Sequence, residues 1–279
     1  VPIDPALPGR YLAGLRSDWG MPDYLIVGNP HTIPLTARLT WVRPDGTGVT
    51  RDVSVAPLQR VNVFVPEEPG IAGQGDVSVA VQSPDPALAV DAEHIAYWGG
   101  WNAAHATEGV APSSTWYLAE GSTTAFDEDV TVFNPTSGPV DVTFDFYGTS
   151  GLLQTRTVRI GEGPGRVKVA VRDWIGSVDH GTRIVGRTPA GQPADIVVER
   201  TMRWDWAGGQ PESHSTPGVA ALSSAWYFAE GDNSFLPPRT SSDAPTRQCV
   251  CVSGDAVLSL ETPPHTRATA GKPARRARP

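Results

Sequence analysis

The chain has 279 residues, with 29 glycines, 27 prolines and a net charge of −8 at pH 7. So many turn-forming residues argue against a helix bundle, and the acidic balance argues against a general nucleic-acid binder. No apolar run reaches the roughly 18 residues that a membrane-spanning helix needs, so we expect no membrane span. Two cysteines, Cys249 and Cys251, make no disulfide framework.

The sequence repeats itself in order. Trp116-Tyr-Leu-Ala-Glu-Gly121 recurs as Trp226-Tyr-Phe-Ala-Glu-Gly231, and Arg10-Tyr-Leu-Ala13 is a degraded first copy. Further pairs follow in the same order, namely Asn29 and Asn134, Arg60 and Arg166, Glu93 and Glu199, Trp98 and Trp204, and His105 and His214. Collinear matches over this length are typical of tandem structural units.

The repeat predicts the organisation of the chain. We expect a short leader (1–9), a first module (10–112, "module one"), a second module (113–222, "module two") and a partial third repeat with a disordered basic tail (223–279). The joints between modules are short, so neighbouring modules should touch. The pattern is lost after Gly231, which a reading-frame slip or a truncated gene would explain.

Each module has the sequence pattern of an antiparallel β-sandwich. In module one, alternate residues from Leu35 to Trp41 are apolar, and the segment from Val140 to Tyr147 alternates in the same way. Further strands of module two are predicted at 116–119, 130–133, 153–160, 166–171, 182–187 and 195–204. Seven short strands separated by turn residues indicate an all-β sandwich, and the best helix candidate, 171–178, covers a turn or two at most.

These motifs carry a resemblance. The Trp-Tyr-x-Ala-Glu-Gly opening, the Asn-Pro pair and the Val-Glu-Arg segment ending at Arg200 resemble a tandem β-sandwich repeat of secreted and cell-wall-associated bacterial proteins. More distantly, they are similar to the sensory rhodopsin transducer-type domain. The resemblance implies a non-enzymatic, mostly extracellular module. Module one departs from the pattern, since Gly14 stands in place of the motif glutamate and His94 in place of the motif arginine.

Two acid–base pairs recur in the modules. Arg60 occurs with Glu93, and Arg166 occurs with Glu199. A buried charge needs a partner, so we interpret each pair as a structural ion pair between strands. The alternative is a pair that faces a ligand, but an isolated arginine–glutamate pair is not a catalyst without a nucleophile and a cleft.

Four tryptophans lie where the modules end, namely Trp98, Trp101, Trp204 and Trp206. They fit packing at the module joint, or an exposed aromatic platform for sugar rings. The histidines of the two loops, His105 and His214, lack a second ligand at metal spacing, so we expect no zinc site and no cofactor. The acidic run 127–129 fits a solvated loop better than a calcium site.

The sequence therefore predicts a non-catalytic extracellular or cell-surface protein that serves as a stalk, an adhesion module or a recognition module. Its partner would be a cell-wall glycan or a surface protein. The alternatives are a carbohydrate-binding accessory region of a cell-wall enzyme and a ligand-sensing transducer-type module. The sequence names neither the ligand nor the oligomeric state.

Overall fold

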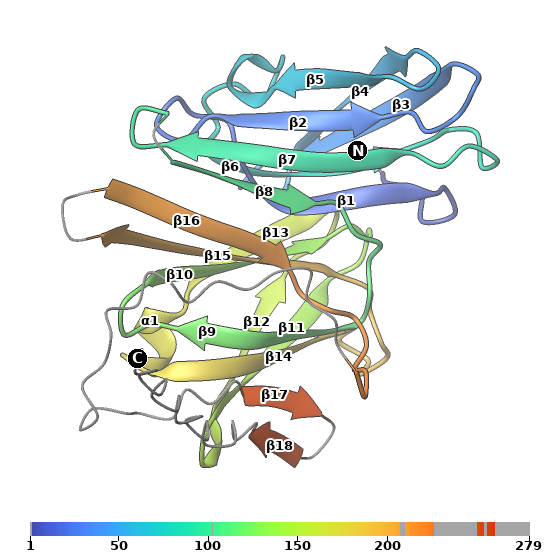
Figure 1. The fold of residues 1–279 in the computed structure, drawn as a ribbon. Helices are drawn as coiled ribbons and strands as arrows, with labels where there is room; N and C mark the ends of the chain where they lie inside the picture. The colour runs from blue at the N-terminus through green and yellow to red at the C-terminus, as the bar shows by residue number, and fades with distance from the viewer. Residues whose placement is uncertain (1, 102, 207–209, 226–249, 254–255, 260–279) are drawn as a thin grey trace, which may run out of the picture.

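A computed structural model describes residues 2–101, 103–206, 210–225, 250–253 and 256–259, and the fold of this part of the chain is almost entirely β (Figure 1). Sixteen strands form four antiparallel four-stranded sheets, so the predicted all-β fold class is confirmed. No helix in these ranges is long and apolar enough to cross a membrane.

Module one consists of two sheets, with the strand orders β1-β6-β3-β4 and β5-β2-β7-β8. The apolar faces of the two sheets enclose one core, in which Leu39, Trp41 and Val27 are fully buried. The strands are β1 (Gly9–Arg16), β2 (Asp23–Gly28), β3 (Leu35–Val42), β4 (Gly48–Val55), β5 (Arg60–Phe64), β6 (Asp76–Gln82), β7 (Asp91–Trp98) and β8 (Ala103–Glu108), with the short helix η1 (Val65–Glu67) after β5.

Module two has the same strand orders in its two sheets, β9-β14-β11-β12 and β13-β10-β15-β16. Its core contains Phe144, Phe146 and Ile184, which are fully buried. The elements are β9 (Thr115–Ser122), β10 (Asp127–Asn134), β11 (Val140–Gly148), β12 (Gly151–Ile160), β13 (Gly165–Ala170), α1 (Arg172–Ile175), β14 (Asp179–Arg187), β15 (Val197–Trp206) and β16 (Gln210–Pro217).

Module two has one strand more than the seven predicted. The extra strand, β16, has prolines at positions 211 and 217 and no apolar alternation, so a period-two search does not find it. It forms because it pairs along its length with β15 at the edge of the sheet, where proline is tolerated. The predicted short helix is α1, and the predicted partial third repeat lies mostly outside the described residues, apart from the hairpin of β17 (Val250–Ser253) and β18 (Ala256–Ser259).

The two Asn-Pro motifs close turns after β2 and β10. Asn134 is fully buried; its Nδ2 donates to the carbonyl of Gly138 at 2.8 Å, and its Oδ1 accepts from the backbone N–H of Thr136 at 3.0 Å. Asn29 binds its own turn in the same way, through the carbonyl of Ile33 and the N–H of His31. Each asparagine therefore supplies the hydrogen bonds that the turn backbone lacks.

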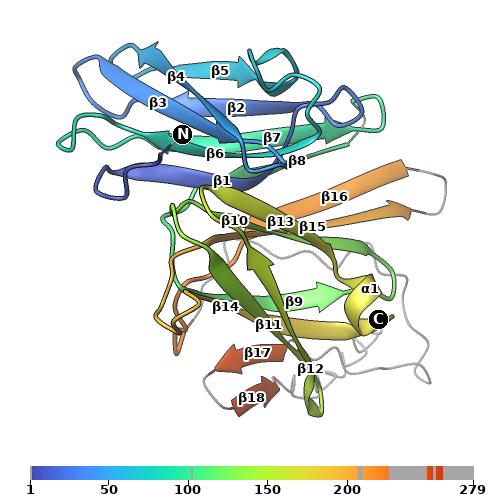
Figure 2. The same ribbon diagram turned by 180° about the vertical axis from the view of Figure 1, so that it is seen from behind.

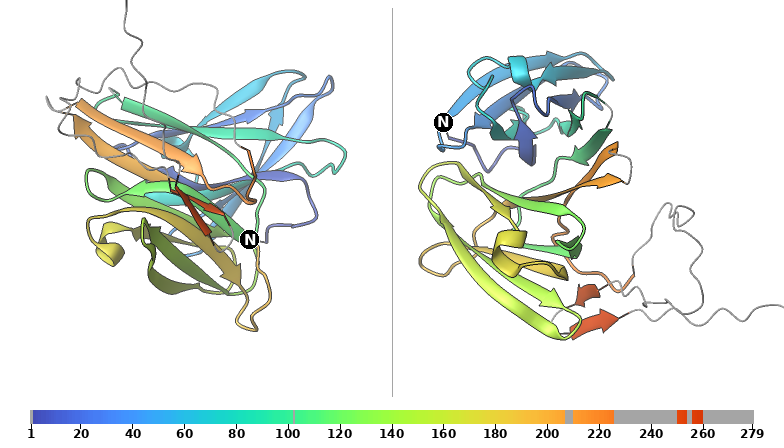
Figure 3. Two further views of the ribbon diagram at one scale, coloured as in Figure 1. Left: turned by 60° about the horizontal axis from the view of Figure 1, so that its bottom comes forward. Right: turned by 90° about the vertical axis from the view of Figure 1, so that its left-hand side faces the viewer.

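The modules are stacked and in contact. The outer face of the β13-β10-β15-β16 sheet lies against β1 and β8 of module one, as the front and back views show (Figures 1 and 2). The side view places β8 and β16 next to each other between the two sandwiches (Figure 3). An apolar cluster joins the modules, in which Tyr11 packs on Phe133 and Val197. The predicted leader also belongs to this cluster, through the buried Ile3.

Replacement of Asn134 by alanine tests the role of the turn. We expect Asn134→Ala to lower the free energy of unfolding by about 2 kcal/mol, because the N–H of Thr136 and the carbonyl of Gly138 lose their partner. Urea denaturation measures the change. The matched control is Asn62→Ala, an exposed asparagine on β5, which should shift stability by less than about 0.5 kcal/mol. Equal stability of the two variants would contradict the assigned role.

Candidate functional site

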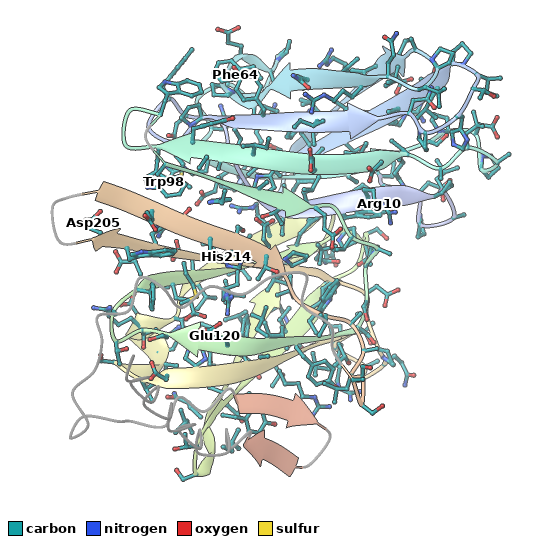
Figure 4. All side chains as sticks on the ribbon, viewed as in Figure 1. Arg10, Phe64, Trp98, Glu120, Asp205 and His214 are labelled. Carbon is teal, nitrogen blue, oxygen red and sulfur yellow. The ribbon has the colours of Figure 1, made fainter. Side chains whose placement is uncertain are left out.

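A group of buried ionisable side chains lies between the two modules. It is formed by β2, β7 and β8 of module one and by β15 and β16 of module two. Figure 4 shows the side chains around this space, with Trp98 at the end of β7 on the module-one side. The labelled Asp205 of β15 and His214 of β16 are exposed side chains of module two, and His214 lies on a strand and not in the predicted loop. Strand alternation explains the placement, because β15 turns Val198 and Arg200 towards the core side of its sheet and Val197 and Glu199 towards module one.

Glu199 is the centre of this group. Its side chain is 3% exposed, and three donors hold its carboxylate. His94 of module one lies 2.8 Å from Oε1, Ser215 donates to Oε1 at 2.7 Å, and the backbone N–H of Gly14 donates to Oε2 at 2.9 Å. A Cβ on Gly14 would lie 2.7 Å from Oε1, so only glycine leaves room for the carboxylate at this position. Glu199 therefore connects the two modules with a charge that is fully paired.

His94 lies between two carboxylates. Its imidazole has no exposed surface; Nε2 faces Glu199 and Nδ1 is 3.5 Å from Oδ1 of Asp23. Burial lowers the pKa of His94, but the charges of Glu199 and Asp23 outweigh this effect, and the pKa rises from 6.5 to about 10. Burial likewise raises the pKa of Glu199, while the His94 charge and the bonds from His94 and Ser215 lower it to about 2. His94 is therefore a cation and Glu199 an anion at neutral pH.

A second histidine at the same interface is kept neutral. The ring of His105 on β8 packs edge-on against His94 at 5.9 Å and hydrogen-bonds Ser213 of β16. Burial, and then the charge of His94, lower the pKa of His105 to about 3. His94 is therefore an imidazolium cation at neutral pH, and His105 is a neutral imidazole. The hydrogen bond between His105 and Ser213 adds a further contact between the modules.

Three linked ion pairs also lie on the outer face of the β13-β10-β15-β16 sheet. Asp129 of β10 accepts from Arg203 at 2.6 Å and from Lys168 at 3.2 Å. Lys168 also reaches Asp76 of module one, at 3.3 Å. Arg166 enters module one as well, where it donates to Ser78 Oγ at 3.0 Å. The outer face of this sheet is therefore charged, and module one supplies matching partners.

The predicted ion pairs are not the pairs that the structure contains. Arg166 donates to Ser78 and to the carbonyl of Ala13, while Glu199 binds His94, so Arg166 and Glu199 each have a partner in module one. In module one, Arg60 is exposed, and no ion pair joins it to Glu93 within the described residues. The arginine and the glutamate share the outer face of one sheet in each module. In module two, Arg166 lies opposite Phe133 and Glu199 lies opposite Thr131 of β10.

The four predicted tryptophans do not form one platform. Trp98 packs on His105 at the module interface, and Trp204 packs on Phe126 within module two. Trp101 is 53% exposed and packs on Tyr97, on the outer face of module one. Trp206 ends β15, and its side chain lies outside the described set.

Sequence reasoning missed the three residues that touch Glu199, namely Gly14, His94 and Ser215. Two of them are the departures of module one from the motif, because Gly14 stands in place of the motif glutamate and His94 in place of the motif arginine. In module two the corresponding residues are Glu120 and Arg200, whose charges interact within the module itself. The signal was therefore present as a pair of substitutions in one copy, but the sequence alone does not show which carboxylate they accommodate.

The acidic run 127–129 is not the solvated loop that we predicted. It begins β10; Asp129 binds Lys168 and Arg203, and Glu128 is buried 3.3 Å from His180. Gly121 of the repeat motif makes room for this pair, since a Cβ there would lie 2.5 Å from the ring of His180. Within the described ranges, no three histidine, cysteine or acidic side chains are grouped so that they could hold a metal ion.

No family model matches the chain, and no curated protein matches it. The structure of Thermotoga maritima 1070 is 17% identical, with 37% of this chain and 93% of that chain covered and a TM-score of 0.33. A variant of B. subtilis oxalate decarboxylase is 9% identical, with 76% and 68% covered. The formate complex of Lactobacillus farciminis oxalate decarboxylase is also 9% identical, with 69% and 73% covered; both have TM-scores of 0.20. These values carry no argument about function.

Removal of the central carboxylate tests the module interface. We expect Glu199→Ala to lower the free energy of unfolding by about 3 kcal/mol, because it leaves His94 charged and buried without its closer partner. The matched control is Glu93→Ala, which removes the residue at the same place on module one. That side chain has no ion pair within the described residues, so the loss should stay below about 0.5 kcal/mol. Equal losses, measured by urea denaturation, would refute the interface role of Glu199.

The raised pKa of His94 predicts a pH dependence. Its ordinary pKa is 6.5 and the folded value is about 10, so its stabilising effect is complete below about pH 6.5 and is lost as the pH rises towards 10. Glu199 adds stability that is complete above about pH 4.5 and is lost towards pH 2, and the lowered pKa of His105 adds stability that is lost as the pH falls from about 6.5 towards 3.

Comparison of the wild type with His94→Gln isolates the part of the pH dependence of stability that comes from His94, at alkaline pH. The difference between their free energies of unfolding should be largest at about pH 6 and should shrink at about pH 9.5, where unfolded His94 has lost its proton. Urea denaturation at the two pH values measures it. A difference that is the same at both values would show that His94 is not held as a cation.

Proposed function

We propose that the chain is a non-catalytic segment of a bacterial secreted or cell-surface protein, in which tandem β-sandwich modules form a rigid stalk that presents a recognition surface. The observation that carries this proposal is the fully paired Glu199 carboxylate between the modules. A buried, fully hydrogen-bonded carboxylate favours one arrangement of its partners, because a shifted interface that keeps Glu199 buried would lose the bonds from His94 and Gly14. A rigid joint is what a stalk requires.

Tandem repetition is supported by two independent features. The sheets of both modules have the same strand orders, and the recurring asparagine, arginine and glutamate residues fall at matching places on them. Glu93 lies opposite Ile26 of β2, as Glu199 lies opposite Thr131 of β10. Repeats of this kind bury their own cores and interact with their neighbours, so a chain of them transmits orientation from one module to the next.

The non-catalytic part of the proposal is supported by the chemistry of the interface. His94 and Glu199 form a histidine–carboxylate pair, but both are buried and their ring nitrogens and carboxylate oxygens already face partners. A general base needs a free position within hydrogen-bond reach of a substrate proton. The pair therefore fits a structural role. The secreted location is supported by the resemblance of the repeat motif, and the gene sequence upstream of Val1 tests it through the presence of a signal peptide.

Distance measurements between the modules test the stalk. Spin labels at Ser54→Cys on β4 and Leu152→Cys on β12, in a background without Cys249 and Cys251, report the separation by double electron–electron resonance. Both labelled positions are exposed. We expect a single narrow distance distribution for the wild type and for the Glu93→Ala control, and a broader distribution for Glu199→Ala. A broad distribution in the wild type would exclude a rigid stalk.

A further inference from the structure

A cavity of about 410 Å³ opens on the outer face of module one, on the β5-β2-β7-β8 sheet. Three aromatic side chains line it, from Tyr24, Tyr97 and Trp101, together with the polar side chains of Arg60 and Asn62. The volume lies in the range of small-molecule sites, which combine apolar walls with a few polar groups. It faces away from the Glu199 interface, since strand alternation places Tyr97 on the opposite side of β7 from His94.

The aromatic rings form one continuous group. Tyr97 packs on Trp101 at 5.0 Å and on Tyr24 at 6.2 Å, and Tyr24 packs on Phe64 at 4.8 Å. Trp101 remains 53% exposed and has a φ of 72°. A tryptophan in the left-handed region is unfavourable, and its exposure gains little hydrophobic free energy. Neither feature serves the core, so the position of Trp101 points to a ligand.

The outer face of module one differs from the matching face of module two in its side chains. The corresponding strand positions there hold Asp129 for Tyr24, Lys168 for Asn62 and Arg203 for Tyr97, as the matching registers show. In module two these charged groups form linked ion pairs, and Lys168 also reaches Asp76 of module one. At the positions of Asp129 and Arg203, module one has the aromatic residues Tyr24 and Tyr97. Its outer face therefore keeps Arg60 and Glu93 but lacks the aspartate, lysine and arginine that form ion pairs on module two.

We propose that this cavity binds a pyranose ring of a glycan. A pyranose has an apolar face of C–H groups, which packs on an indole or phenol ring, and an edge of hydroxyl groups. Trp101 and Tyr97 offer the ring surface. Arg60 and Asn62 are exposed at the same cavity and offer donors to hydroxyl or carboxylate oxygens, and the amide of Asn62 also accepts.

This proposal deepens the recognition part of the proposed function and rests on it, whereas the stalk depends on a different face. The two can therefore fail separately. Loss of glycan binding with a narrow intermodule distance leaves the stalk intact, and a broad intermodule distance with retained glycan binding leaves the cavity intact.

Calorimetric titration of the full chain with three soluble oligosaccharides tests the site. The probes are chitohexaose, cellohexaose and hexagalacturonate, which present N-acetylated, neutral and acidic pyranoses. We expect at least one to bind, and Trp101→Ala or Tyr97→Ala to weaken that binding at least about tenfold. Arg60→Ala should weaken it as well, most of all for the galacturonate if the guanidinium contacts a carboxylate. Leu152→Ala, an exposed apolar residue on β12 of module two, is the matched control and should bind as the wild type does.

A conservative variant distinguishes loss of the aromatic ring from a change in the conformation of the loop. Trp101→Phe keeps a ring at the left-handed position and should recover most of the binding that Trp101→Ala loses. Absence of binding to all three oligosaccharides overturns the proposal, as does equal binding by the wild type, Trp101→Ala and Tyr97→Ala. Sedimentation velocity gives the remaining outcome. Self-association of the wild type that Trp101→Ala abolishes would assign the face to a second copy of the chain and would also overturn the glycan site.

Discussion

The carboxylate of Glu199 has to be neutralised without water, and this requirement determines how the two sandwiches meet. Its partners come from both modules, the N–H of Gly14 and the imidazole of His94 from one and the hydroxyl of Ser215 from the other. Since an uncompensated buried charge costs several kcal/mol, the modules are held in the one arrangement that pairs it. The apolar contact of Tyr11 with Phe133 also joins the two modules.

The same requirement explains why the recurring arginines and glutamates do not pair with each other. Arg166 and Glu199 recur with Arg60 and Glu93, which suggested mutual pairs, but recurrence reports only that the positions share a sheet face. In module two that face is covered, and both residues find partners in module one. In module one it is open, and the same residue types remain beside a cavity instead of an interface.

One fold thus uses one face in two ways. Where the outer positions of the sheet are charged, as at Lys168 and Arg203, the face joins modules through ion pairs. Where they are aromatic, as at Tyr97 and Trp101, the face keeps exposed rings beside polar side chains. The strand order is the same in both sheets, so we attribute the proposed difference in role to the side chains. This division of labour is the basis for regarding the chain as a stalk that carries a recognition site.

The sequence by itself determined the fold class and the strands with apolar alternation, because a period of two and turn residues are local signals. It did not reveal β16, whose polar residues form a strand only through pairing with β15. Nor did it reveal the partners of Glu199 or the cavity of Trp101. His94 and Glu199 are 105 residues apart, and which charge meets which depends on how two finished sandwiches dock. Local pattern encodes the elements, whereas only packing in three dimensions brings distant charges and rings together.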